Sequence, residues 1–200
     1  MRRVLKLLAI LLSISGVFAG DKDARFITKP AAEYPNRVTQ EKVTVAAMAY
    51  VNEEDLHLAF GKADPNKYGV LPVLVVIHND SDKAIRLSLQ AEFVDAKDHH
   101  VDATPASEVR FVGAPPKRKD SNIGMGSPLP FPLPKKGAPL GGWEIDGRAL
   151  RAKMVPPGEQ VSGFFYFQAR MESGGKLYLN GLSDAATGKE LFYFEVPLDK

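Results

Sequence analysis

"LPVLVVIHNDSDKAIRLSL", residues 71–89, changes its hydrophobic pattern half-way along. Up to Ile77 it is almost entirely apolar, whereas over residues 84–94 apolar and polar side chains alternate. Such alternation is typical of a strand with one face on a core and the other in water. Between them, residues 79–83 (NDSDK) are of types whose side chains bond their own backbone, which predicts a turn. Two strands joined by so short a turn are expected to pair antiparallel.

The first of these strands needs cover on its outer face, because that face is as apolar as its inner one. One candidate cover is a short helix after Asn52. Asn52 can cap this helix, acidic residues fill its first turn, Leu56 and Phe60 share one face, and Gly61 can end it. The other candidate is a long Pro- and Gly-rich insertion, described below.

Further strands are predicted at residues 43–50, 160–168, 176–180 and 190–198. In the last of them, alternate side chains are expected to point the same way, namely Phe192, Phe194, Val196 and Leu198. Seven or eight short strands with turns between them predict an all-β fold, a two-sheet sandwich.

The domain organisation expected from this pattern is a single β-sandwich domain at residues 41–200 with an insertion at 104–154. An extended lead-in at residues 20–40 can add an edge strand, since its prolines exclude a central one. Inside the insertion, Thr104 is expected to cap a short helix, and residues 143–154 have helical character.

Two motifs carry a resemblance to a known class of domains. "VLVVIHNDSDKAIRLSL" is similar to a strand–turn–strand, and "PPGEQVSGFFYF" resembles a later turn and strand with Pro157, Gly158 and Gly163 at its marker positions. Both are found in bacterial secreted immunoglobulin-like β-sandwich domains, many of them of unknown function. The resemblance implies an immunoglobulin-like sandwich and no particular activity. The Cys…Trp…Cys pattern of antibody domains is absent.

The N-terminus predicts export. Basic residues at Arg2, Arg3 and Lys6 precede an apolar run, and small residues allow cleavage near Ala19, so residues 1–19 form a predicted signal peptide. The mature chain is then secreted or periplasmic, and no second long apolar run predicts a transmembrane segment. The chain has no Cys, so its fold is expected to depend on burial without disulfides.

The charge of the mature chain argues against nucleic acid as a partner. Three of the 26 Lys and Arg residues lie in the leader, which leaves 23 cations against 24 anions, a formal charge of −1. Nucleic-acid-binding domains are usually strongly basic.

The segment "DAKDHHVD" holds the most suggestive side chains, Asp95, Asp98, His99, His100 and Asp102. Imidazole and carboxylate groups are good ligands for zinc and similar ions. However, adjacent His residues in an extended chain point to opposite faces, so one metal rarely takes both. We therefore predict an exposed polar turn here, and a metal site at Asp98 and His99 is the alternative.

No other motif predicts chemistry. The chain contains no HExxH, GxSxG, P-loop or GxGxxG pattern, and without Cys it has no thiol nucleophile. His57 and His78 have no base beside them in the sequence and are expected to be surface or core histidines. We accordingly predict no catalytic residue, no cofactor and no metal ligand. A chain that is not an enzyme is the favoured interpretation.

The Pro- and Gly-rich insertion at residues 113–142 contains seven Pro, six Gly and a net charge of +4. Within it, "SPLPFPLPKKG" alternates Pro with Leu129, Phe131 and Leu133, which favours a stiff polyproline II rod. The favoured interpretation is that these side chains fold back over the sheet. The alternative is a basic arm that contacts an envelope polymer, lipid headgroups or a protein partner.

Together these features predict an exported, non-catalytic β-sandwich domain that binds or supports another cell-envelope component. The alternative is an envelope hydrolase or metal-binding protein that uses Asp98 and His99 or carboxylates that meet only in the folded chain.

Overall fold

The computed structural model describes residues 26–113 and 139–199, so the predicted leader and most of the insertion lie outside the described residues. Its strands are β1 (Arg37–Gln40), β2 (Val43–Ala49), β3 (Leu71–Asn79), β4 (Ile85–Val94), β5 (His100–Thr104), β6 (Met154–Val155), β7 (Gln160–Phe167), β8 (Lys176–Asp184) and β9 (Phe194–Pro197). Its α-helices are α1 (Glu53–Phe60), α2 (Ala106–Val109) and α3 (Trp143–Gly147), and 3-10 turns occupy Ala31–Glu33 and Pro65–Tyr68.

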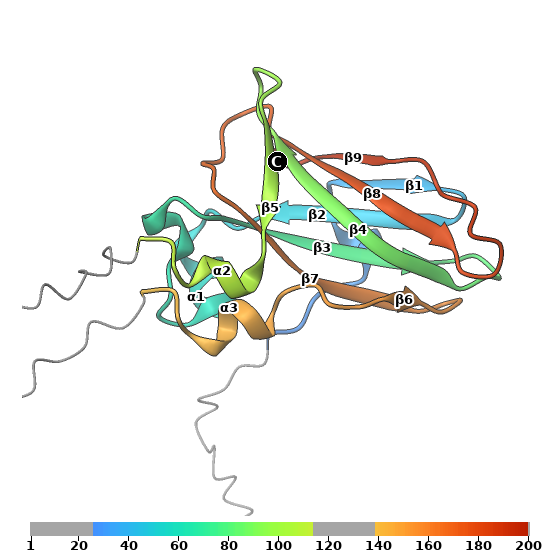
Figure 1. Cartoon of the computed structure of the whole chain (residues 1–200), viewed down its shortest axis with the longest axis horizontal. Helices are drawn as coiled ribbons and strands as arrows, with labels where there is room; N and C mark the ends of the chain where they lie inside the picture. The colour runs from blue at the N-terminus through green and yellow to red at the C-terminus, as the bar shows by residue number, and fades with distance from the viewer. Residues whose placement is uncertain (1–25, 114–138, 200) are drawn as a thin grey trace, which may run out of the picture.

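The described strands form one continuous antiparallel sheet that curls into a nearly closed barrel (Figure 1). Eight of them follow one another in the order β1-β2-β3-β7-β5-β4-β8-β9, and β6 pairs with β4 beside this path. The edge strand predicted in the lead-in is confirmed, since β1 lies at one end of this order.

The predicted immunoglobulin-like two-sheet sandwich is wrong. β5 pairs with β7 through Ala103 and Thr104 and with β4 through residues 100–102, so it joins the two groups of strands that a sandwich would keep apart. The segment HVDAT is short and half polar, so its sequence does not indicate a strand and predicts a turn and the start of an insertion instead. Without this strand, the remaining strands separate into two sets and resemble two sheets.

The two ends of the sheet, β1 and β9, lie side by side but share no strand ladder among the described residues. Two side chains connect them instead. Asn36 Nδ2 donates to the carbonyl of Asp199 at 2.6 Å, and Gln40 Nε2 donates to the carbonyl of Tyr193 at 3.0 Å. The barrel is therefore held closed at this seam by amide side chains and by the apolar contacts inside it.

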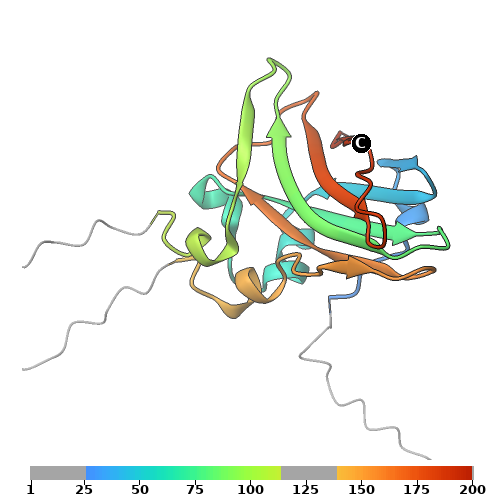
Figure 2. The same cartoon turned by 45° about the vertical axis from the view of Figure 1, so that its right-hand side comes forward.

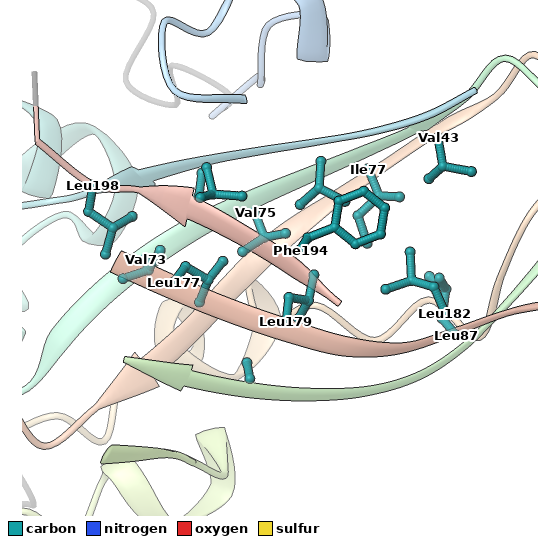
Figure 3. Packing of buried hydrophobic residues seen from close by; sticks show 14 of the residues in the cluster. Val43, Val73, Val75, Ile77, Leu87, Leu177, Leu179, Leu182, Phe194 and Leu198 are labelled. Carbon is teal, nitrogen blue, oxygen red and sulfur yellow. The ribbon is translucent and has the colours of Figure 1, made fainter. Parts of the chain in front are cut away.

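The interior of the barrel is filled by apolar side chains, most of them aliphatic (Figure 3). Val75 and Ile77 of β3 meet Leu177 and Leu179 of β8, and Phe194 of β9 lies between them. Burial on this scale contributes about 25 cal/mol for each Å² of apolar surface removed from water. This contribution is what allows a chain without disulfides to stay folded.

A second apolar cluster lies outside the barrel, between the sheet and the helices. Figure 1 shows α1, α2 and α3 gathered on one side of the sheet. Leu56 and Phe60 of α1 and Ile145 of α3 pack there against Leu74 of β3 and Phe164 of β7, all of them buried. The expectation that α1 covers the apolar outer face of β3 is confirmed. The predicted folding back of Leu129, Phe131 and Leu133 lies outside the described residues.

Side-chain hydrogen bonds of two asparagines fix the start of α1 and the turn after β3, as expected. The side chain of Asn52 accepts a hydrogen bond from the backbone N–H of Glu54 at 2.8 Å, and α1 ends at Gly61. Asn79 is fully buried, and its amide donates to the carbonyls of Lys83 at 2.7 Å and Val155 at 3.0 Å. The predicted turn at 79–83 is thereby confirmed and tied to β6.

Four boundaries differ from prediction, the first being the end of β8, which runs on to Asp184 instead of stopping at residue 180. α2 begins after Pro105 without a side-chain cap, because Thr104 is the last residue of β5. The helix α3 stops at Gly147, and the chain continues to β6. β9 begins only at Phe194, and Phe192 is 73% exposed, so it does not share the buried face of Phe194.

β4 and β8 bend strongly where they pair (Figure 2). The register between them shifts from Leu87 to Gln90, and Gly181 of β8 lies opposite the shift with φ of +83°. A Cβ on Gly181 would lie 2.1 Å from the carbonyl oxygen of Ser88, so only glycine allows this approach. This bulge is what turns the sheet towards closure.

Candidate binding cleft

The position between β4 and β7 in the barrel wall is only partly filled. β5 occupies it at one end, where it pairs with both strands, and the segment from Ala149 to β6 occupies it at the other end. Between them, residues 89–91 of β4 have no strand partner on the side of β7 among the described residues. Since neighbouring strands lie about 4.8 Å apart, this gap is about one strand wide.

A cavity of about 530 Å³ opens at this gap, and we call it the β4–β7 cleft. Its floor is apolar and continues into the barrel core through Leu89, Ala91, Leu150 and Phe165. Its rim is polar. The residues that line the cleft are Leu89, Gln90, Ala91, Glu92, Asp102, Ala103, Thr104, Pro105, Ala106, Ala149, Leu150, Phe164, Phe165 and Tyr166.

The rim is acidic. Glu92 and Asp102 are directly opposite each other on β4 and β5, and His100 Nδ1 lies 2.6 Å from Glu92 Oε2. The hydrogen bond with Glu92 raises the pKa of His100 above its usual value, against partial desolvation, and the fields of Asp98 and Asp102 act in the same direction as that bond. His100 takes up one oxygen of Glu92, and the remaining carboxylate oxygens of Glu92 and Asp102 favour cations and hydrogen-bond donors at the rim.

The residues of the predicted DAKDHHVD turn are divided between two elements. Asp95, Asp98 and His99 form the hairpin turn between β4 and β5, which confirms the exposed turn, whereas His100 and Asp102 belong to β5. Asp95 accepts from the backbone N–H of Lys97 and of His99, and its other oxygen lies 2.9 Å from His99 Nδ1. The backbone N–H of His99 is the largest influence that lowers the pKa of Asp95.

The alternative metal site at Asp98 and His99 gains no geometric support. The imidazole of His99 is hydrogen-bonded to Asp95. The side chain of Asp98 is exposed to solvent, and its backbone has a φ of +65°. Within residues 26–113 and 139–199, no three His, Cys, Asp or Glu side chains are grouped as metal ligands.

The two remaining histidines lie apart from the β4–β7 cleft. His57 is exposed on α1, and His78 Nε2 lies 2.8 Å from Asp80 at the end of β3. Of the 113–142 insertion, only Gly113 and residues 139–142 are described, and Leu140 is buried in the cluster under the helices. The rest of the predicted contact arm lies outside the described residues. Over the described part of the chain, no helix is long and apolar enough to cross a membrane.

Sequence reasoning missed the cleft residues for a simple reason. Alternation correctly places Leu89 and Ala91 on the inner face of β4, but it does not show that the neighbouring strand position is empty beside them. The gap exists because β5 ends at Thr104 and the chain leaves the sheet through α2. The sequence signal for the end of β5 is Pro105, which directly follows the strand and cannot donate to a sheet.

Comparison with known proteins adds little. No protein-family model matches the chain. No curated protein matches it either. Among solved structures, it is similar to the yjhA protein from Bacillus subtilis, at 13% identity over 83% of this chain and 98% of that one, with a TM-score of 0.44. It is also similar to a protein described as ApaA from Bordetella pertussis, at 13% identity over 84% of this chain and 98% of that one, with a TM-score of 0.35.

A structural-genomics target, SoR45, is similar at 10% identity over 80% of this chain and 90% of that one, with a TM-score of 0.34. All three scores are below 0.5, so these likenesses carry no argument about function. The expected membership of the bacterial immunoglobulin-like β-sandwich domains is wrong. One curled sheet replaces the two sheets on which that resemblance depended.

Proposed function

We propose that this chain is an exported, non-catalytic binding protein that takes up an apolar group of a cell-envelope component in the β4–β7 cleft. The observation that carries the proposal is the cavity of about 530 Å³ whose apolar floor is part of the barrel core. Pockets of this size and lining are typical of sites for small ligands or for single anchoring groups of a partner.

The acidic rim adds a chemical preference. An apolar group that enters the cleft gains about 25 cal/mol for each Å² removed from water. A cation or hydrogen-bond donor attached to that group would lie beside Glu92 and Asp102 at the mouth. The favoured ligand is therefore an apolar chain or side chain next to an ammonium or amide group, as in a lipid amine or a polypeptide segment.

The groups inside the cleft favour binding over catalysis. Thr104 and Tyr166 are the hydroxyl-bearing residues among those that line it. The hydroxyl of Thr104 accepts from Gln168 Nε2 at 3.2 Å, and the hydroxyl of Tyr166 donates to the buried carbonyl of Ile145 at 2.6 Å. In the part of the chain that the structure describes, neither has a histidine or carboxylate within hydrogen-bond distance to act as its base.

Export, with cleavage near Ala19 and a periplasmic or extracellular location, belongs to the same proposal and is supported by the sequence of the leader alone. The contact arm at 113–142 stays a further proposal on the sequence.

The test uses hexylammonium and hexanoate as probes on the chain from residue 20 onward. Amide chemical shifts of Leu89, Ala91 and Phe165 are followed by NMR during titration with each probe. We expect hexylammonium to shift these amides with a lower dissociation constant than hexanoate, because only the ammonium is attracted by Glu92 and Asp102.

A matched pair of variants locates the binding. Gln90 and Ser88 are both exposed on the outer face of β4, but only Gln90 lines the cleft. Gln90→Trp should obstruct the mouth and abolish the shifts, whereas Ser88→Trp should leave them unchanged. Equal loss in both variants, or shifts that are confined to other parts of the chain, would refute the cleft as the binding site.

A further inference from the structure

A second pocket, of about 400 Å³, lies outside the barrel beside α3. It is lined by Phe26, Thr28, Trp143, Gly147, Arg148, Ala149, Ser162 and Gly163. We call it the Arg148 pocket. It shares only Ala149 with the β4–β7 cleft, so it is a separate surface of the molecule.

Two hydrogen bonds fix the backbone of Arg148, but among the described residues its guanidinium has no counter-ion. Its backbone N–H donates to the carbonyl of Glu144 at 3.1 Å, and its own carbonyl accepts from Phe164 at 2.8 Å, so the end of α3 is fixed on β7. Its guanidinium lies 4.6 Å from the centre of the Phe26 ring. Among the described residues, its Nε is buried without a hydrogen-bond partner.

The neighbouring Arg151 shows what Arg148 lacks. Arg151 forms an ion pair with Asp146 at 2.5 Å, but within the described part of the chain no carboxylate lies within ion-pair distance of Arg148. Partial burial lowers the pKa of Arg148, and the field of Glu144 opposes this, yet a guanidinium stays protonated in proteins. A desolvated cation in this position is stabilised by an added anion.

Trp143 also lines the pocket. It is 71% exposed, which is a large apolar surface to leave in water. A Cβ on Gly147 would lie 3.2 Å from the Trp143 ring, so the indole lies against the backbone of the last turn of α3. The ring is thereby presented as a platform next to Arg148.

The pocket is also lined by two hydroxyl groups. Thr28 Oγ1 and Ser162 Oγ lie 3.0 Å from each other, and both residues line the pocket. Each hydroxyl retains capacity for a further hydrogen bond after this contact. The pocket therefore combines one cation, one exposed indole and two hydroxyls within about 400 Å³.

We infer that the Arg148 pocket binds an acidic saccharide, with the carboxylate on the guanidinium of Arg148 and the apolar face of the sugar ring on Trp143. A carboxylate matches the fork of the guanidinium, which can donate two parallel hydrogen bonds. A sugar ring has an apolar C–H face for the indole and hydroxyls for Thr28 and Ser162. This goes beyond the proposed function, because it assigns a different site and a ligand of opposite charge.

The experiment uses the fluorescence of Trp143, which is the only Trp of the chain. Digalacturonate is titrated into the chain from residue 20 onward, with maltose as the neutral disaccharide and inorganic phosphate as the anion without a ring. We expect digalacturonate to change the emission saturably, and maltose and phosphate to bind at least about tenfold more weakly, since each lacks one of the two recognised groups.

Arg110 supplies the matched control, because its guanidinium also lies over a phenyl ring, that of Phe111, at 4.8 Å, but outside the pocket. Arg148→Gln should weaken digalacturonate binding about tenfold or more, and Arg110→Gln should leave it unchanged. Arg148→Gln could fail to fold, so a second variant, Trp143→Ala, changes an exposed position. It should weaken digalacturonate binding by a similar factor, as measured by the NMR shifts of Ser162 and Gly163. Phosphate or maltose binding as tightly as digalacturonate, or equal losses in both Arg variants, would overturn the inference.

Discussion

The two halves of the barrel wall differ in what lies outside them. The outer face of β3, with Leu74 and Val76, is buried under the helices, whereas the outer face of β4 is polar and lies in water, for example at Arg86 and Gln90. Inside the barrel the two strands are alike, since Val75 and Leu87 belong to the same core. The amino-acid pattern of a strand thus reports how many of its faces are covered, and not which sheet it belongs to.

The β4–β7 cleft lies where these halves meet. β7 belongs to the covered half and β4 to the exposed half, and the strand between them, β5, ends at Thr104 before it fills the gap. The border therefore combines an apolar floor with an acidic rim, and neither half alone has both.

Shortening an outward side chain in each half should affect stability very differently. Leu74→Ala should lower the free energy of unfolding by about 3–5 kcal/mol, because it leaves a cavity under the helices. Gln90→Ala, at an exposed outward position of β4, should change it by less than about 0.5 kcal/mol. Urea unfolding measures both. Similar losses would mean that the outer face of β4 is covered in solution as well.

The bend of the exposed half can be tested with two glycines of similar backbone. Gly181 and Gly188 have φ of +83° and +73°, but a Cβ on Gly188 meets nothing within 4 Å. Gly188→Ala should cost about 1 kcal/mol from its positive φ alone. Gly181→Ala should cost about 2–3 kcal/mol, because its Cβ also meets the carbonyl of Ser88. Thermal unfolding compares them, and equal costs would show that the close approach at the bulge is unimportant.

The smallest expected effect lies on the acidic rim of the exposed half. The pKa of His100 is raised in the folded state, mainly by its hydrogen bond with Glu92. The stability that this contact adds is therefore fully present below the unfolded pKa of about 6.5 and is lost as the pH rises through the folded value.

Glu92→Gln should lower the pKa of His100 in an NMR titration. It should also reduce the melting temperature slightly at pH 6, with the difference fading as the pH rises above the folded pKa of His100. Asp82→Asn, an exposed change away from this contact, is the control. A His100 titration that is identical in Glu92→Gln and in the unchanged chain would show that the hydrogen bond does not form in solution.

Much of the local structure could be predicted. Alternation in residues 84–94 identifies β4, the residues around Asn52 identify the start of α1, and NDSDK identifies the turn in which Asn79 is buried. These features depend on neighbours within a few residues, so a single sequence contains them. The apolar outer face of β3 likewise predicts that another element covers it, and α1 packs on that face.

The sheet architecture and the sites could not be predicted in the same way. The sequence places His100 and Asp102 in a turn, but they belong to the strand that joins both halves. The resulting sandwich is wrong because five partly polar residues carry almost no hydrophobic period of their own. Likewise, nothing in the sequence distinguishes Arg148, which lacks a counter-ion among the described residues, from Arg151, which has one.

The positions of strands and turns and the apolar faces can be read from short stretches of sequence, because they follow from backbone preferences and from the side-chain period. Three further features became visible only in the folded chain: the strands form one curled sheet, β5 leaves part of the wall open, and Arg148 and the exposed Trp143 line the same pocket. Those outcomes depend on contacts between residues far apart in the chain, where the total burial selects one pairing of strands over another.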